Sequence, residues 1–214
     1  MGFSIKTTDA LIVVDIQNDF LPGGTLAVPE GDQIIPNVNH LMKKFSALGG
    51  RVILTQDWHP SNHLSFASQH PGKNSFDPIE GIAGIGPVLW PDHCVRETTG
   101  AAFSSQLDTG KAHLILRKGL HRSVDSYSAF TENDQKTETG LAGYLENAGL
   151  KRIFICGLAL DYCVAWSAMD GAKKGFETCV LPDLCRGIAP ESVQTAEQGM
   201  KELGILFISP GDIT

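Results

Sequence analysis

The chain has 214 residues, 42% hydrophobic and 19% charged, a composition typical of a globular domain and too apolar for a disordered chain. Its 17 basic and 24 acidic residues give a net charge of −7, which argues against nucleic acid or an anionic membrane as a partner. No apolar run approaches the roughly 18 residues of a membrane span, and the first residues lack the pattern of a signal peptide. We therefore expect a single domain over residues 1–214.

The five cysteines are an odd number and include no CxxC pair, which argues against a disulfide scaffold and against a cysteine zinc cluster. They are Cys94, Cys156, Cys163, Cys179 and Cys185. Reduced thiols are the usual state of such cysteines in the cytoplasm, so we expect a cytoplasmic protein. Cys156 and Cys179 fall within apolar runs and are expected in the core, whereas Cys94 and Cys185 fall in predicted loops.

Short β-branched runs alternate with helical patterns along the chain. In chain order we predict a strand at 10–15, a helix at 34–48, strands at 51–56 and 113–117, a helix at 141–148, a strand at 152–156, a helix at 161–174, a strand at 177–181, a helix around 192–203 and a strand at 205–208. The first strand is continuously apolar, as expected when helices cover both faces of a sheet. The pattern predicts an α/β three-layer sandwich with a central, mainly parallel sheet of about six strands flanked by helices.

Two connections, 60–112 and 119–140, are far longer than the usual two to six residues. Parallel sheets bind their ligands beyond the carboxyl ends of the strands, in loops of this kind. We therefore look for the functional site at that edge of the sheet.

Three predicted strands end near residues that could act together. Asp15 ends the first, Lys118 follows the third, and Cys163 lies just beyond the fourth. Alone, Asp15 could simply bond loop amides, Lys118 could be solvated, and Cys163 could be inert. Together, an acid and a cation can take the proton of a thiol and stabilise its thiolate.

The fourth strand runs into GLALDYCV, where Asp161 is expected to cap the next helix. Cys163 would then lie in the first helical turn, where the helix dipole lowers the pKa of the thiol. The backbone N–H groups of Ala159 and Cys163 are candidate donors to an oxyanion.

A second group follows the second predicted strand. Asp57 and His59 are two residues apart in an extended segment, so their side chains point the same way. With His93, they would form a two-histidine, one-carboxylate metal site with open positions. An isolated DxH pair is common on protein surfaces, and His63 and His70 are nearby alternatives.

These motifs resemble a known family. VVDIQNDF with GGTLAV, TQDWHPSNHLSF, WPDHCV, the lysine of RKG and GLALDYCV are similar, in order and spacing, to segments of nicotinamidases in the isochorismatase-like cysteine hydrolase superfamily. The resemblance covers nearly the whole chain. It implies the isochorismatase-like fold and a metal-containing amidohydrolase that converts nicotinamide to nicotinate and ammonia in NAD salvage.

The resemblance also implies roles for individual residues. Cys163 would be the nucleophile, Asp15 the general base and acid, and Lys118 the cation beside the thiolate. The metal ligands would be Asp57, His59 and His93, holding one divalent ion, with zinc favoured over iron or manganese. Substrate contacts would come from Phe20, Trp90, Ala159 and Tyr127, and the Leu158–Ala159 peptide would be cis. Nicotinamide and pyrazinamide are the substrates implied, and a homo-oligomer remains compatible with the sequence.

Three other functions stay open. An isochorismatase would share Asp15 and Lys118 but needs no cysteine nucleophile. A cysteine amidase acting on carbamoyl or ureido groups would have no use for a metal that binds a pyridine. A ligand-binding module without turnover has no need for a poised thiol.

Overall fold

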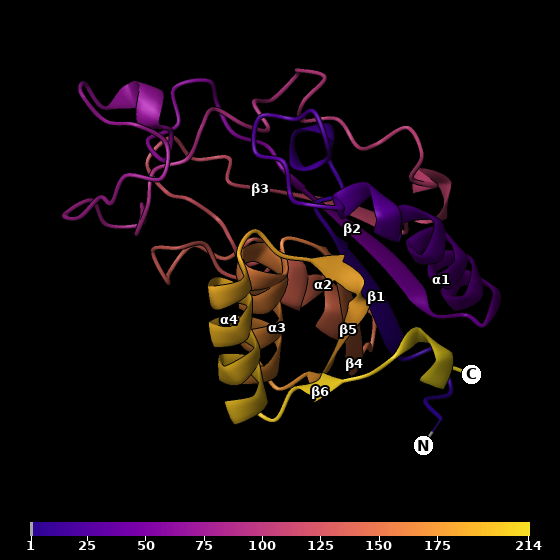
Figure 1. Ribbon diagram of the computed structural model, residues 1–214. Coiled ribbons are helices and arrows are strands. Elements are labelled where there is room, and N and C mark those ends of the chain that lie inside the picture. Colours follow the sequence, from indigo (N-terminus) through magenta and orange to yellow (C-terminus); the bar gives the residue numbers. More distant parts are fainter. Residues whose placement is uncertain (1) are drawn as a thin grey trace.

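The centre of the computed structural model, which describes residues 2–214, is a six-stranded sheet in the order β3-β2-β1-β4-β5-β6 (Figure 1). All neighbouring strands are parallel, which confirms the predicted sheet. The strands are β1 (Asp9–Val14), β2 (Arg51–Asp57), β3 (Leu114–Lys118), β4 (Arg152–Leu158), β5 (Glu177–Arg186) and β6 (Leu206–Phe207).

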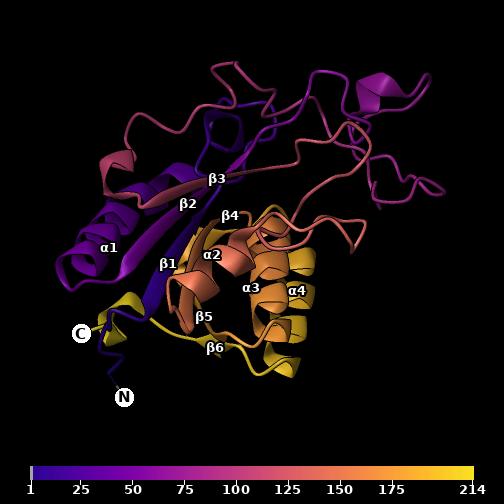
Figure 2. The same ribbon diagram turned by 180° about the vertical axis from the view of Figure 1, so that it is seen from behind.

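Helices cover both faces of this sheet, as the predicted three-layer architecture requires (Figures 1 and 2). The helix α1 (Ile35–Ala47) lies on one face, and α2 (Leu141–Asn147), α3 (Ala165–Lys173) and α4 (Pro190–Glu202) lie on the other. The buried residues of α1 recur every three or four positions and form one apolar stripe toward the sheet: Ile35, Val38, Leu41, Met42 and Phe45.

The burial of each strand follows from its place in the sheet. Every residue of the central strands β1 and β4 is buried, because helices cover both of their faces. At the edge, β3 alternates in exposure, and Ile115 is 46% exposed. Cys156 and Cys179 are fully buried in the core, as expected.

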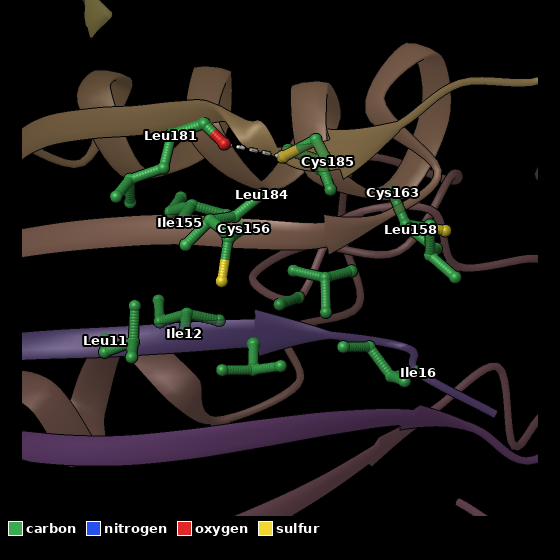
Figure 3. Packing of buried hydrophobic residues seen from close by; sticks show 14 of the residues in the cluster. Leu11, Ile12, Ile16, Ile155, Cys156, Leu158, Cys163, Leu181, Leu184 and Cys185 are labelled. Carbon is green, nitrogen blue, oxygen red and sulfur yellow. Dashed lines mark hydrogen bonds between the residues drawn. The ribbon is translucent and has the colours of Figure 1, made fainter. Parts of the chain in front are cut away.

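The strand β5 is longer than predicted and includes Cys185, which was expected in a loop. Pro182 and Asp183 resemble a strand end, but a register shift between β4 and β5 accommodates this segment and lets the pairing continue. The Cys185 thiol donates to the carbonyl oxygen of Leu181 over 3.3 Å (Figure 3).

The long connections 60–112 and 119–140 extend beyond the carboxyl ends of the strands (Figure 1). Helical structure in the first is limited to two short 3₁₀ turns, at Ala67–Gln69 and Thr109–Lys111. Among residues 2–214, no helix combines the length and the apolar character needed to cross a membrane.

Candidate active site

Asp15 is the residue directly after β1, and its side chain is completely buried. Its backbone is in the left-handed region, with φ 47°. The hydroxyl of Thr55, on β2, donates to Asp15 Oδ1 over 2.6 Å and accepts from the Asp15 N–H over 3.2 Å. Burial raises the pKa of Asp15 to about 6, so this carboxyl group exchanges its proton near neutral pH. Sequence reasoning missed Thr55, since a threonine in a strand is ordinary.

Lys118 ends β3, and its ammonium group is buried among polar partners. Nζ lies 2.9 Å from Oδ2 of Asp15 and 2.5 Å from Oδ1 of Asp57. It also donates to the carbonyl oxygen of Ser126 over 2.7 Å and lies 3.4 Å from Sγ of Cys163. Burial alone would lower the pKa of Lys118, but the two carboxylates raise it well above the ordinary value, so the group stays charged.

Cys163 lies in a π-helical turn, Leu160–Val164, that precedes α3 at the carboxyl end of β4 (Figure 3). The prediction that Asp161 caps this helix is wrong. Its carboxylate instead accepts from the N–H groups of Ile188 and Ala189 and from the hydroxyl of Ser192, at the start of α4. The wide turn thus points Asp161 at free amides of the neighbouring helix rather than of its own.

The sulfur of Cys163 lies within 4.8 Å of carboxylate oxygens of Asp15 and Asp57. Burial raises the pKa of this thiol well above its ordinary value, and the nearby Lys118 only partly offsets that effect. The expectation of a lowered pKa is therefore wrong, because burial and the nearby carboxylates outweigh the Lys118 cation. The resting group is a neutral thiol and needs a base before it can attack.

The chain between β4 and Cys163 makes a tight turn. The Leu158–Ala159 peptide is cis, as expected. Gly157 has φ 119°, and a Cβ atom there would lie 2.2 Å from the carbonyl oxygen of Val14, so only glycine fits. Ala159 and Cys163 both line the pocket described below, and the oxyanion role of their N–H groups stays a prediction.

Asp57, His59 and His93 are buried and bring one potential ligand atom each to within 4.8 Å of one another. Nδ1 of His59 bonds the carbonyl oxygen of Gly119 over 2.9 Å, and Nδ1 of His93 bonds that of Pro91 over 2.8 Å. These bonds leave Nε2 of both rings available as a ligand.

The donor set suits a divalent ion. Within residues 2–214, Nε2 of His59 is buried without a hydrogen-bond partner, which is costly unless another group binds it. Burial lowers the pKa of His59 well below its ordinary value, so the ring is neutral, as a ligand must be. Two imidazoles and a carboxylate suit zinc, iron or manganese.

The two alternative histidines have other partners. His63 packs 4.4 Å from His59 between ring centroids, but Nδ1 bonds the Ser65 hydroxyl over 2.7 Å and Nε2 faces the Val124 carbonyl oxygen at 3.2 Å. Nε2 of His70 bonds the carbonyl oxygen of Leu64. His63 also forms a second compact group of ligand-type atoms with His59 and Asp125.

One pocket joins Cys163 to the candidate metal site. It is lined by Phe20, Leu26, Asp57, Trp90, His93, Asp125, Tyr127, Ala159, Tyr162, Cys163 and Ile188. The four expected substrate contacts, Phe20, Trp90, Tyr127 and Ala159, are among them, and Nε1 of Trp90 donates to the Tyr127 hydroxyl over 3.0 Å.

The sequence did not reveal Asp125 or Tyr162. Asp125 lies in a long polar loop whose course no pattern predicts, and burial raises its pKa to about 6. Tyr162 neighbours Cys163, which was the one available signal.

Both the sequence and the structure are similar to known proteins. The isochorismatase domain profile matches residues 9–209. The chain is 50% identical to a nicotinamidase of Acinetobacter baylyi over 206 residues, covering 95% of this chain and 94% of that protein.

Two solved structures extend the comparison. A nicotinamidase/pyrazinamidase structure of Acinetobacter baumannii is 48% identical, with a TM-score of 0.92 and coverage of 97% and 98% of the two chains. A pyrazinamidase of Pyrococcus horikoshii in complex with zinc is 40% identical, with a TM-score of 0.77 and coverage of 94% and 99%.

Proposed function

The chain belongs to the isochorismatase family, and from that premise and the geometry of the pocket we propose that it hydrolyses nicotinamide to nicotinate and ammonia, in NAD salvage. One observation carries the proposal. A single aromatic-lined pocket contains the Cys163 thiol and the Asp57 and His93 side chains of the candidate metal site. A flat ring with a carboxamide on one side and a nitrogen on the other matches that arrangement, and we expect pyrazinamide to be accepted too.

The first half of the reaction uses the buried charges around Cys163. Asp15 takes the proton of the thiol, and the sulfur attacks the carboxamide carbon. Lys118, 3.4 Å from the sulfur, stabilises the developing thiolate. The N–H groups of Ala159 and Cys163 hold the oxyanion. The C–N bond then breaks, and Asp15 gives its proton to the departing ammonia.

The second half returns the enzyme to its resting state. A water molecule attacks the carbonyl carbon of the thioester and gives a proton to Asp15. The C–S bond breaks, the sulfur takes the proton back from Asp15, and the product acid leaves and loses its own proton to solvent as nicotinate. A pKa of about 6 suits Asp15 to both proton transfers, because the group is poised near the working pH.

The metal site would complete substrate recognition. Asp57, His59 and His93 would hold one divalent ion, with zinc favoured, and such an ion would act as a Lewis acid toward the ring nitrogen. Phe20 and Trp90 then hold the faces of the ring, and Tyr127 fixes Trp90 through their hydrogen bond.

A substrate panel separates this function from the alternatives. The purified protein is offered nicotinamide, an N-carbamoyl amine and isochorismate in separate reactions, with ammonia as the readout for the first two and pyruvate for the third. We expect ammonia from nicotinamide alone. Preference for either of the other substrates would overturn the proposal.

Two further parts of the proposal concern the whole chain. We propose that the chain is a single catalytic domain, and the family match covers residues 9–209. The five cysteines are unpaired and buried, which supports a reducing compartment, the cytoplasm.

A further inference from the structure

Tyr162 lines two separate hollows. One is the active-site pocket. The other is a mostly apolar groove on the surface between α3 and α4, whose lining includes Tyr162, Ala165, Trp166, Met169 and Ala196. Apart from Tyr162, none of these residues lines the pocket, so Tyr162 is the element shared by the two spaces.

The half-buried ring of Tyr162 is held by other aromatic side chains of the pocket. It packs edge-to-face on Trp90, with ring centroids 5.0 Å apart and planes at 86°. It packs in the same way on Tyr127, at 5.5 Å and 73°. Such contacts hold the ring in one orientation. The backbone is held as well, since the Tyr162 N–H donates to the carbonyl oxygen of Ala159.

We propose that Tyr162 determines specificity by closing the substrate pocket toward the groove between α3 and α4, which limits the size of the substituents that a substrate ring can carry. This inference rests on the proposed function and deepens it, because it defines the substrate class as small pyridine-type amides without bulky apolar ring substituents. Removing the ring would join the pocket to the groove and give such a substituent an apolar place.

Position 5 of nicotinamide tests this wall most directly. The carboxamide group on ring position 3 must reach Cys163, and the ring nitrogen must reach the candidate metal site. Position 5 is meta to the ring nitrogen and to the carboxamide, so a substituent there leaves both of these contacts free to form. A phenyl group at that position adds a second ring, which we expect the closed pocket to exclude and the mostly apolar groove to accept.

The experiment compares kcat/KM for 5-phenylnicotinamide and for nicotinamide in one set of variants, measured as ammonia release. For Tyr162→Ala we expect the ratio of the two values to rise about tenfold or more, the scale of discrimination set by fitting or excluding an apolar group. Tyr162→Phe keeps the ring contacts and should keep the wild-type ratio. Met169→Ala enlarges the groove but not the pocket wall, and should also leave the ratio unchanged.

An unchanged ratio in a Tyr162→Ala protein that still hydrolyses nicotinamide would overturn the inference, as would an equal rise in Met169→Ala. If Tyr162→Ala fails to fold, Tyr162→Leu replaces it, since leucine also removes the ring. A rise in the ratio for that variant supports the inference, and an unchanged ratio overturns it. Failure of the proposed function has a different signature, because wild-type protein would then release no ammonia from nicotinamide. In that case, calorimetry tests the wall by measuring the affinities for 5-phenylnicotinate and for nicotinate. The ratio of the first affinity to the second should rise in Tyr162→Ala.

Discussion

Lys118 and Asp57 join the Cys163 thiol and the candidate metal site into one charged network, with Nζ of Lys118 2.5 Å from Oδ1 of Asp57. The other oxygen of Asp57 lies 3.8 Å from Nε2 of His59. Burial alone would raise the pKa of Asp57, but the Lys118 ammonium holds it below the ordinary value. The Asp57 carboxylate therefore belongs to the candidate metal site and also contacts Lys118 beside Cys163. It stays ionised because the Lys118 ammonium is next to it.

Removal of this lysine should be costly to folding as well as to activity. Lys118→Ala leaves the carboxylates of Asp15 and Asp57 buried without their counter-charge, so the free energy of unfolding should fall by roughly 3–5 kcal/mol in urea titrations. Alkylation of Cys163 at neutral pH should also slow, since the thiolate loses its cation.

The matched control is Lys201→Ala, which breaks an exposed i,i+4 pair with Glu197 and should cost less than about 1 kcal/mol. Equal stabilities for the two variants would contradict the buried network. An unchanged alkylation rate in Lys118→Ala would exclude the lysine from contact with the thiol.

Two cysteine variants separate chemistry from packing. Cys163→Ala should abolish ammonia release, because the Cys163 thiol lines the pocket and is the proposed nucleophile. The protein should stay folded. Cys156→Ala leaves a small cavity in the core beside β1 and should lower the free energy of unfolding by roughly 1–2 kcal/mol, with activity kept in the folded fraction. Substantial turnover by Cys163→Ala would rule out the thioester mechanism.

The pH dependence should follow Asp15. As the proposed base, Asp15 must be ionised, and burial raises its pKa to about 6, so kcat/KM should be lost as the pH falls through that value. Thr55→Val removes the hydroxyl that donates to Asp15 and favours its ionised form, so this acid limb should move to higher pH.

Thr178→Val is the control for that shift. The hydroxyl of Thr178 is also buried, but it donates to the carbonyl oxygen of Phe176, away from the pocket, so the acid limb should stay where it is. A limb that is unmoved in Thr55→Val, or that moves in Thr178→Val as well, would remove Asp15 from the role of base.

Removal of metal should weaken the binding of nicotinamide more than that of benzamide, which lacks the ring nitrogen. Chelation should raise KM for nicotinamide strongly and leave the slow hydrolysis of benzamide nearly unchanged, because a site built for a nitrogen discriminates against the isostere. His93→Ala should mimic chelation, since it removes one of the three candidate ligands.

The histidine controls follow from the hydrogen bonds. His63→Ala should have a smaller effect than His93→Ala, since both ring nitrogens of His63 face other partners, and His70→Ala should have none. If the chelated protein kept its KM for nicotinamide, the proposed role of the metal in binding the ring nitrogen would be contradicted. The protein would then be a cysteine amidase that binds its substrate without a metal.

Much of this site could be predicted because a parallel sheet brings its strand ends to one edge. The apolar runs located β1, β3 and β4, and a parallel sheet places Asp15, Lys118 and Cys163, which follow or end these strands, at one edge. The direction of the Cys163 pKa could not be predicted, because it depends on how completely the long loops bury the thiol. Thr55 and Asp125 were missed for a related reason, since their importance comes from neighbours distant in sequence.

Ammonia release from nicotinamide by the purified protein tests the central claim most directly, with wild-type protein, chelated wild-type protein and Cys163→Ala measured side by side. The account predicts rapid release by the wild type, release by the chelated protein only at much higher substrate concentration, and none by Cys163→Ala. No release by metal-loaded wild-type protein, or equal release by all three samples, would contradict it.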